Sequence, residues 1–448
     1  MSNGEIDKED DEAPKSRHPR WVRINTIKTT LQEQLSKTFA DYRKTDDLSQ
    51  ILVAPRSAKI YYEDPTIPNL LALPAQIDLS RSIAYAKGQI IFQDKASCFP
   101  AYLLDPSPDD GDVIDATAAP GNKTTHLAAI AQSRSQSGNG TTIIAFERDR
   151  GRTAILQKMI ELATTDGIIK VKGGSDFIAA KPDSVEFANV RAILLDPSCS
   201  GTGIVGRDDA IKMHLPEAQG GRTALPTPSK GKKRKRGDEE SRQQTKTTTL
   251  SLEMDELPPE ETVVVGKLSD RLTALSAFQL HILTHAMRFV NAHKITYSTC
   301  SVHFEENERV VFQALATAVA KERGWRILKR SEQVEGLQKW SRRGMWEDEK
   351  TSCALDEAEK REVLDGCIRC DKGTEEGTMG FFVAAFVREG DPDAIRLSDK
   401  IADSEDEWHG FEESIDLQQI GQTSDRPALP ELGKSRKKKA RKRKTVTG

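Results

Sequence analysis

The sequence lacks long hydrophobic runs and has few cysteines, and each absence excludes a class of protein. No apolar stretch among its 448 residues approaches the roughly 20 that a membrane-spanning helix needs, so we expect no membrane partner. The N-terminus, MSNGEIDKEDDEAPK, has neither the basic flank nor the apolar core of a secretion signal. The six cysteines follow no regular spacing, which argues against a disulfide framework. We therefore expect a protein of a reducing compartment, acting as a monomer.

Neither sign of charge dominates the chain, because the formal net charge is only -3. The average conceals local asymmetry: the first dozen residues are acidic, whereas Lys232–Arg236 and Lys434–Lys444 are dense basic runs. Such runs are typical of nuclear or nucleolar addressing or of non-specific attraction to phosphate. Solvated disorder without either role is the alternative.

Composition divides the chain into ordered and low-complexity parts. Residues 1–17 are polar and acidic, and we expect them to be disordered. An α+β domain is expected over 18–105 and a larger domain over 106–388. The stretch 217–261, rich in Lys, Gly, Pro, Thr and Glu, interrupts the larger domain as an expected disordered insertion. The tail 389–448 has the same character.

Apolar strands alternate with helical stretches in the larger domain. We expect strands at 112–115, 142–146, 168–172, 190–195 and 295–298, and helices at 123–133, 150–163, 268–289 and 305–320. This alternation predicts an α/β fold with a mostly parallel sheet covered by helices on both faces.

The segment after the first of these strands has the pattern of a ligand-binding turn. The strand ends at Asp115, a turn of small residues follows, and a helix begins near Lys123. Ala118, Ala119 and Gly121 would let a ligand approach the backbone, and Pro120 would stiffen the turn. The spacing matches neither a Walker loop nor G-x-G-x-x-G. A carboxylate at Asp115 suits a cationic ligand such as a sulfonium.

Two further acids follow neighbouring strands. Glu147 ends the second strand, where α/β sheets hold ribose hydroxyls, although a solvated charge is the alternative. Asp176 follows the third strand and would accept from an adenine amino group, with a helix N-cap as an equal alternative.

Two cysteines also follow strands, within turns of small polar residues. Cys199 lies in DPSCSGTG and Cys300 in STCS, so both are expected at the edge of the sheet that carries Asp115. Cys300 precedes an expected helix start near Phe304, and a helix N-terminus would favour its thiolate.

A thiolate beside a sulfonium methyl donor indicates a particular reaction. Carbon 5 of a pyrimidine is too weak a nucleophile to take a methyl group directly. Thiolate addition at carbon 6 makes carbon 5 an enamine carbon, which can attack the methyl group. A base then removes the carbon-5 proton, and elimination frees the enzyme.

Several motifs together resemble the Sun-domain (RsmB-like) RNA cytosine-C5 methyltransferases, most of all the eukaryotic branch that acts on large-subunit ribosomal RNA. They span about 20–385 apart from the insertion: PRWVRINTIKT, PAQIDL, GQIIFQDKASC, ATAAPGNKT, DPSCSGTG, YSTCS-x-x-x-x-EN and GFFVA. The resemblance implies a Rossmann-like class I methyltransferase fold that uses S-adenosylmethionine. It also implies an RNA substrate, large-subunit rRNA or a pre-ribosome, and action in the nucleus and nucleolus.

The resemblance also assigns roles by position. Cys300 corresponds to the nucleophile, Cys199 to the cysteine needed for product release, Asp196 to the group at the cytosine N3/N4 edge, and Lys123 to a residue near the base. Thr117 stands where many relatives have cysteine. The chain starts almost at PRWVRINT, so a helical region that relatives carry before it is expected to be missing. The implied S-adenosylmethionine contacts are Thr117, Ala118, Ala119, Pro120, Gly121, Asn122, Lys123, Glu147, Arg152, Asp176 and Asp196.

Other features leave alternatives open. Basic residues of the first domain form either an RNA-binding surface or an ordinary solvated face: Arg20, Arg23, Lys28, Lys37, Arg43 and Lys44. The pair Cys367 and Cys370, with Cys353 upstream, is a weak zinc pattern, and we expect no metal. A transfer-RNA cytosine methyltransferase is a second candidate function, and a non-catalytic ribosome-assembly scaffold is a third.

Overall fold

The computed structural model describes residues 18–75, 77–107, 111–134, 141–164, 167–204, 264–347 and 356–388. The segments expected to be disordered, with both basic runs, lie wholly or almost wholly outside these ranges. Within them, no helix has the length and apolar character needed to cross a membrane.

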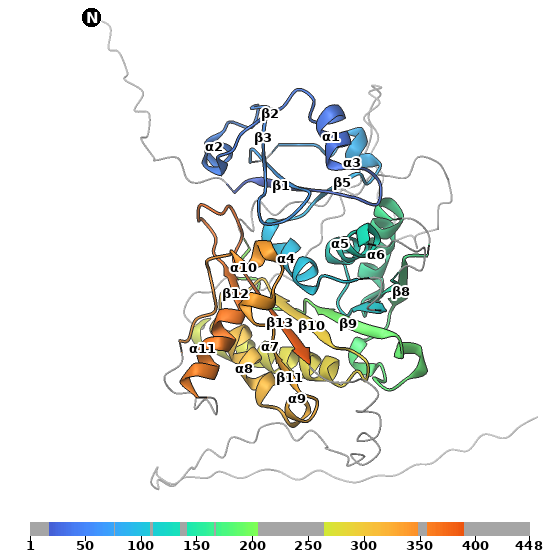
Figure 1. The fold of residues 1–448 in the computed structure, drawn as a ribbon, viewed down its shortest axis with the longest axis vertical. Coiled ribbons are helices and arrows are strands. Elements are labelled where there is room, and N and C mark those ends of the chain that lie inside the picture. Colours follow the sequence, from blue (N-terminus) through green and yellow to red (C-terminus); the bar gives the residue numbers. More distant parts are fainter. Residues whose placement is uncertain are drawn as a thin grey trace, which may run out of the picture. The chain divides into compact units, whose positions relative to one another are not determined.

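The first domain is built on a five-stranded sheet with the order β2-β3-β4-β1-β5 (Figure 1). The interior strand β1 pairs antiparallel with β4 and with the edge strand β5. Its apolar residues Trp21, Val22 and Ile24 are buried, as expected of a strand with a neighbour on each side. The strands are β1 (Arg20–Ile24), β2 (Arg43–Lys44), β3 (Ile60–Glu63), β4 (Leu70–Leu73) and β5 (Ile90–Phe92), and the helices are α1 (Leu31–Lys37), α2 (Leu48–Val53) and α3 (Ile83–Ala86).

The second domain contains an eight-stranded sheet with the order β11-β13-β10-β9-β6-β7-β8, and β12 pairs with β13. Neighbours from β10 to β8 are parallel, whereas β13 runs antiparallel to β10, β11 and β12. The predicted α/β, mostly parallel sheet is confirmed. Its strands are β6 (Asp112–Asp115), β7 (Ile143–Glu147), β8 (Ile169–Gly173), β9 (Val190–Leu195), β10 (Lys294–Thr299), β11 (Trp325–Ile327), β12 (Ile368–Cys370) and β13 (Phe381–Arg388).

Helices cover both faces of this sheet because successive strand residues point to opposite sides. Val113 packs with α4 and α5 on one face, whereas Ile114 packs with α7 and α8 on the other. The helices are α4 (Lys95–Leu104), α5 (Asn122–Arg134), α6 (Arg150–Ala163), α7 (Val264–Met287), α8 (Glu308–Ala316), α9 (Ala318–Glu322), α10 (Glu335–Gln338) and α11 (Glu357–Gly366).

Ala101 and Leu104 of α4 pack with Val113 and Leu194 of the large sheet, so α4 contributes to the core of that sheet. One expectation needs correction. The single helix expected over 305–320 is a 3-10 turn at Phe304–Glu306 followed by α8 and α9. It breaks at Asn307, whose φ of -112° and ψ of -102° are not helical. The Asn307 side chain instead forms hydrogen bonds with Thr299 and Ser301, in the turn that precedes the 3-10 turn.

Candidate active site

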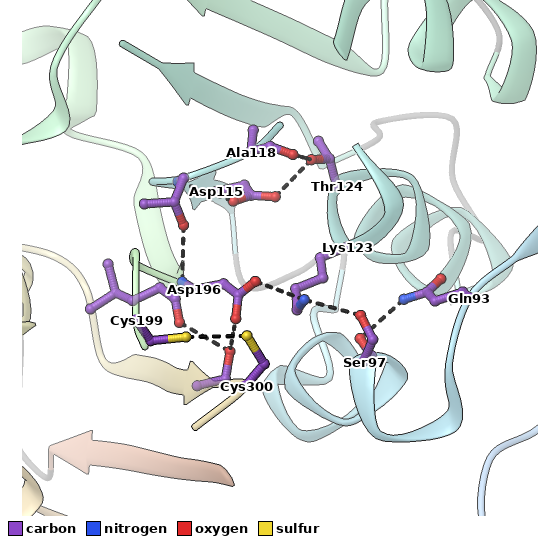
Figure 2. Close-up of polar contacts among 12 residues, drawn as sticks. Gln93, Ser97, Asp115, Ala118, Lys123, Thr124, Asp196, Cys199 and Cys300 are labelled. Carbon is purple, nitrogen blue, oxygen red and sulfur yellow. Dashed lines mark hydrogen bonds and ion pairs between the residues drawn. The ribbon is translucent and has the colours of Figure 1, made fainter. Parts of the chain in front are cut away.

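The two cysteines that follow strands face each other across neighbouring strands. Cys199 follows β9 and Cys300 follows β10, and these strands are parallel neighbours, so their carboxyl ends lie side by side. The two Sγ atoms are 3.1 Å apart, within hydrogen-bonding distance for thiols (Figure 2). Both side chains are partly exposed, unlike the other described cysteines. The structure thus brings together the two thiols that the sequence predicted at this edge.

Two consecutive residues of the YSTCS-x-x-x-x-EN motif hold the two cysteine turns in place. The Glu306 carboxylate accepts a hydrogen bond from the Ser200 N–H at 2.9 Å, next to Cys199. Asn307 accepts from the Thr299 hydroxyl at 2.5 Å and donates to the Ser301 carbonyl at 3.0 Å, so it brackets Cys300. Both acid and amide are fully buried. Sequence reasoning used this pair only as a family motif and did not foresee its structural role.

Glycines allow a further segment to join the cysteine turns. The Gly203 N–H donates to the Cys300 carbonyl at 2.9 Å, and the Gly380 N–H donates to the Gly203 carbonyl at 2.8 Å. A Cβ on Gly203 would lie 2.1 Å from the Gly380 oxygen, so no larger residue fits there. The GFFVA motif is therefore tied directly to the nucleophile turn.

A partly exposed ion pair lies beside the thiols. The Lys123 ammonium is 2.7 Å from one Asp196 carboxylate oxygen, and the Ser298 hydroxyl donates to the other at 2.7 Å (Figure 2). The Asp196 N–H donates to the Thr117 hydroxyl at 2.9 Å, which links this strand end to the small-residue turn. Lys123 also contacts the Ser97 hydroxyl at 3.0 Å and faces the Phe381 ring at 5.4 Å. Ser97 and Phe381 were not singled out from the sequence.

These neighbours separate the acidities of the two thiols. The hydrogen bond from Cys199 lowers the pKa of Cys300, and the Lys123 charge adds to this against burial and the nearby Asp196 carboxylate. The same thiol contact raises the pKa of Cys199 well above its ordinary value, together with burial. Cys300 is therefore the more acidic thiol of the pair, and Cys199 is the less acidic one. The cause differs from the expected one, because α8 begins only at Glu308, too far along the chain for a helix dipole to act.

Asp115 has a different role in the small-residue turn from the one expected. The Asp115 carboxylate is buried and accepts from the Thr124 hydroxyl at 2.7 Å and the Thr117 N–H at 3.3 Å. It braces the turn rather than presenting itself to a cation. Burial raises the pKa of Asp115 to about 6, against the effect of these hydrogen bonds.

Gly121 is also needed for packing rather than for ligand approach. Its φ is +113°, and a Cβ there would lie 3.0 Å from Met159 and 3.2 Å from Leu156, both on α6. Ala118 and Ala119 are buried and pack with Leu156. The peptide bond before Pro120 is cis. Thr117, Pro120, Asn122 and Lys123 are the partly exposed members of this turn.

The acids after the neighbouring strands have defined partners. Glu147 is 5% exposed and accepts from the Asp149 N–H at 2.8 Å, so the solvated alternative is wrong. Arg152 lies 3.8 Å from Glu147 and donates to the Ala119 carbonyl at 2.7 Å. Asp176 caps a 3-10 turn by accepting from the Ile178 N–H at 3.0 Å, which matches the alternative considered for it. Its other oxygen is 3.7 Å from Arg148.

The site extends along one edge of the sheet. The order β7-β6-β9-β10 places Glu147, the small-residue turn, Asp196 and the two cysteines one after another. A buried acceptor for hydroxyl groups thus lies at one end and the more acidic thiol at the other, with the small-residue turn between them. This is the layout that a nucleoside with a reactive group at its far end requires.

Comparison with known proteins finds two matching family models. A family model described as 16S rRNA methyltransferase RsmB/F matches residues 101–220. A second, described as the ferredoxin-like domain of NOL1/NOP2/Sun domain family member 5, matches residues 18–93. Over these two segments the chain resembles the Sun-domain methyltransferase family. The second match covers the strands of the five-stranded sheet, and the first covers strands β6 to β9 of the large sheet.

Relatives of this family resemble the chain over most of its length. The 25S rRNA (cytosine-C(5))-methyltransferase rcm1 of Schizosaccharomyces pombe is 35% identical over 82% of this chain. A 28S rRNA (cytosine-C(5))-methyltransferase of Mus musculus is 31% identical over 83% of it. The chain spans 62% of the length of each. A methyltransferase homologue from Pyrococcus horikoshii shares the fold, with a TM-score of 0.50, 18% identity and coverage of 83% of this chain and 87% of its own.

Proposed function

We propose that this protein transfers a methyl group from S-adenosylmethionine to carbon 5 of a cytosine in large-subunit rRNA, through a covalent adduct with Cys300. The observation that carries this is the contact of two thiols at 3.1 Å beside the pair Lys123–Asp196. A thiolate held in this way is ready to add to an electron-poor ring.

The residues at the edge of the sheet fit the methyl donor. Glu147 is a buried carboxylate already oriented by the Asp149 N–H, as an acceptor for ribose hydroxyls should be. The partly exposed positions Thr117, Pro120 and Asn122, with the buried Ala118, Ala119 and Gly121, would form the floor of the pocket, and Arg152 and Asp176 would border it. When bound, S-adenosylmethionine supplies an electrophilic methyl group.

In the first half of the reaction the Cys300 thiolate adds to carbon 6 of cytosine, and the electron pair of the 5,6 double bond becomes available at carbon 5. Asp196 uses only part of its acceptor capacity on Lys123 and Ser298, so it can also accept from the cytosine 4-amino group. Lys123 keeps this carboxylate in place. Carbon 5 then takes the methyl group.

Release requires loss of the carbon-5 proton. Once Cys300 is a thioether, the contact that most raises the pKa of Cys199 is lost, and Cys199 can give its proton to water. The resulting thiolate takes the carbon-5 proton. The carbon–sulfur bond breaks, the double bond re-forms, and its electrons return to Cys300 as a thiolate. One proton is released to solvent for each methyl group transferred.

The choice of rRNA rests on relatives whose names specify the 25S or 28S molecule. By extension we place this protein in the nucleus, on a pre-ribosome, as a monomer. The first domain is the proposed accessory RNA-binding surface, and its exposed basic residues Lys37, Arg43 and Lys44 are candidates for it.

The test uses the full chain with S-adenosylmethionine that carries a labelled methyl group. Label is expected in protein-free large-subunit rRNA and not in transfer RNA, and bisulfite sequencing should locate it at one cytosine. Cys300→Ala protein is the control and should transfer no label. Transfer to tRNA alone would contradict the substrate, and label without a bisulfite-resistant cytosine would contradict the reaction.

A further inference from the structure

Arg23 is a fully buried arginine on β1 that reaches from the first domain into the second. Its guanidinium donates to the Gln93 side-chain oxygen at 2.7 Å, to the Thr125 hydroxyl at 2.9 Å and to the Asn122 carbonyl at 3.4 Å. Thr125 and Asn122 lie in the first turn of α5, on either side of Lys123. The residue expected at an RNA-binding surface is therefore 1% exposed and holds the helix that carries Lys123.

This arginine is an unusual charge to bury. Within the described residues no carboxylate pairs with it, and its Nη1 has no hydrogen-bond partner. Burial lowers the pKa of Arg23 to about 10. The acidic group that opposes this is Cys98, but burial raises the pKa of that thiol to about 12, so it stays neutral. A buried cation without a counter-ion contributes little to stability, which suggests a role in the site.

A second connection leads from Arg23 to Lys123 through the other side of the site. Gln93, whose oxygen is held by Arg23, donates its amide N–H to the Ser97 carbonyl at 3.0 Å. The Ser97 hydroxyl then accepts from the Lys123 ammonium at 3.0 Å (Figure 2). One residue of the first domain thus fixes both the backbone around Lys123 and the hydroxyl that receives its ammonium.

Five groups surround that ammonium, each from a different element. They are Ser97 on α4, Asp115 at the end of β6, Asp196 after β9, Cys300 after β10 and the Phe381 ring on β13. Ser97 and Phe381 are uncharged and limit where the ammonium can go. Asp196 alone would allow Lys123 to swing about its carboxylate, because a flexible four-carbon side chain has many rotamers.

We propose that Ser97, held by Gln93 and Arg23, is a positioning residue that keeps the Lys123 ammonium near the Cys300 thiolate. The first domain thereby sets the reactivity of the nucleophile in addition to any contact with RNA. This inference rests on the proposed function for its effect on methyl transfer, but its effect on the thiol can be measured without RNA or S-adenosylmethionine.

The main experiment measures alkylation of Cys300 in the full chain by iodoacetamide as a function of pH, with each cysteine quantified by mass spectrometry. In Ser97→Ala the pH midpoint for Cys300 should rise by about half a unit, because a displaced ammonium stabilises the thiolate less. Lys123→Met should shift it further. Ser97→Thr, which keeps the hydroxyl, should restore the wild-type midpoint.

The double variant separates positioning from a general structural effect. In the Lys123→Met background, Ser97→Ala should cause no further shift, because the group that it positions is gone. An equal shift in both backgrounds, or no shift in wild type, would overturn the proposal. Thermal melting of each variant shows whether the fold is kept.

Arg23 and Asn25 provide a matched pair for the first domain. Asn25 is also buried, immediately follows β1, and donates to the Ala163 carbonyl on α6 at 2.6 Å, away from Lys123. Arg23→Met should raise the Cys300 midpoint, whereas Asn25→Ala should leave it unchanged even where both lower the melting temperature. Equal shifts would mean that domain attachment alone matters. If Arg23→Met does not fold, Gln93→Met tests the same connection.

Methyl transfer distinguishes the two proposals. Ser97→Ala should lower kcat by about tenfold with little change in KM for RNA, since substrate binding is not its task. Altered alkylation in a protein that methylates no RNA would sink the proposed function and leave the positioning role. If Ser97→Ala protein showed normal methylation and normal alkylation, the positioning role would be overturned and the proposed function would stand.

Discussion

Two pairs of cysteines in this molecule show what makes a thiol reactive. Cys199 and Cys300 follow the ends of parallel strands, are partly exposed, and contact each other at 3.1 Å beside Lys123. Cys367 immediately precedes the short strand β12 and Cys370 is its last residue. The two are buried in different apolar clusters. Burial raises the pKa of both well above the ordinary value. A thiolate needs a donor or a cation as well as access, and only the first pair has them.

The largest expected effect is on activity. Cys300→Ser should lower methyl transfer on the order of a thousandfold or more, because the nucleophile of the covalent step is lost. Cys367→Ala is the matched control, and it should keep activity within about threefold, since it removes one buried sulfur from a different apolar cluster from the one that Cys300 packs against. Steady-state transfer of labelled methyl groups measures both. Equal losses of methyl transfer in the two variants would contradict the claim that only the first pair of cysteines is reactive.

Chemical labelling tests the same distinction without substrate. Native protein treated briefly with iodoacetamide should be alkylated at Cys300 about a hundredfold faster than at Cys367 or Cys370, which should react only after unfolding. As the pH falls, alkylation of Cys300 should decline on passing through its pKa, which lies below the ordinary value of 9.0. Peptide mass spectrometry resolves each site. Reaction at Cys370 first would contradict the assignment.

A smaller effect is expected from loosening the turn that holds Cys300. Asn307→Asp keeps the acceptor for Thr299 but loses the donor to the Ser301 carbonyl, so the turn should be less well fixed. We expect kcat to fall about tenfold. Stopped-time transfer assays measure this, with Asn291→Asp, which removes a comparable donor to the Ala188 carbonyl away from the site, as the control. An equal fall of kcat in the control would contradict the claim that activity depends on how well the Cys300 turn is fixed.

Asp115 extends the comparison between exposed and buried groups to a carboxyl group, because it lies at a strand end, as the reactive cysteines do, but is buried. Its pKa of about 6, above the ordinary 3.8, means that the folded state holds its proton more tightly than the unfolded state. Stability is therefore lost as pH rises through this interval, by roughly 1 kcal/mol between about pH 5 and pH 7. Asp115→Asn should not show this loss. Urea unfolding at the two pH values, wild type against variant, measures the difference.

The sequence predicted the elements with continuous apolar runs and the positions that follow them. The bounds of β6, β9 and α6 agree with the expected ones, because apolar residues and a capping Asp149 define them locally. The meeting of Cys199 and Cys300 followed from the rule that parallel strands end at one edge. These inferences needed only neighbours along the chain.

The roles that sequence could not predict depend on residues far along the chain. Gly121 looked like a position for a ligand, but α6 side chains nearly 40 residues later occupy its free side. Arg23 looked like a surface charge, but Gln93 and Thr125 enclose it. The acidity of Cys300 was attributed to a helix, but it comes from Cys199 and Lys123. A pattern fixes where a residue lies in an element, whereas its chemistry depends on what packs against it.

The most direct test of the central claim is to trap the covalent adduct. Cys199→Ala protein, incubated with large-subunit rRNA and S-adenosylmethionine, should form an RNA–protein species that survives a denaturing gel, because addition proceeds and release does not. Digestion and mass spectrometry should locate the nucleotide on Cys300. The account would be contradicted if no adduct formed while Cys300→Ala protein still methylated the RNA.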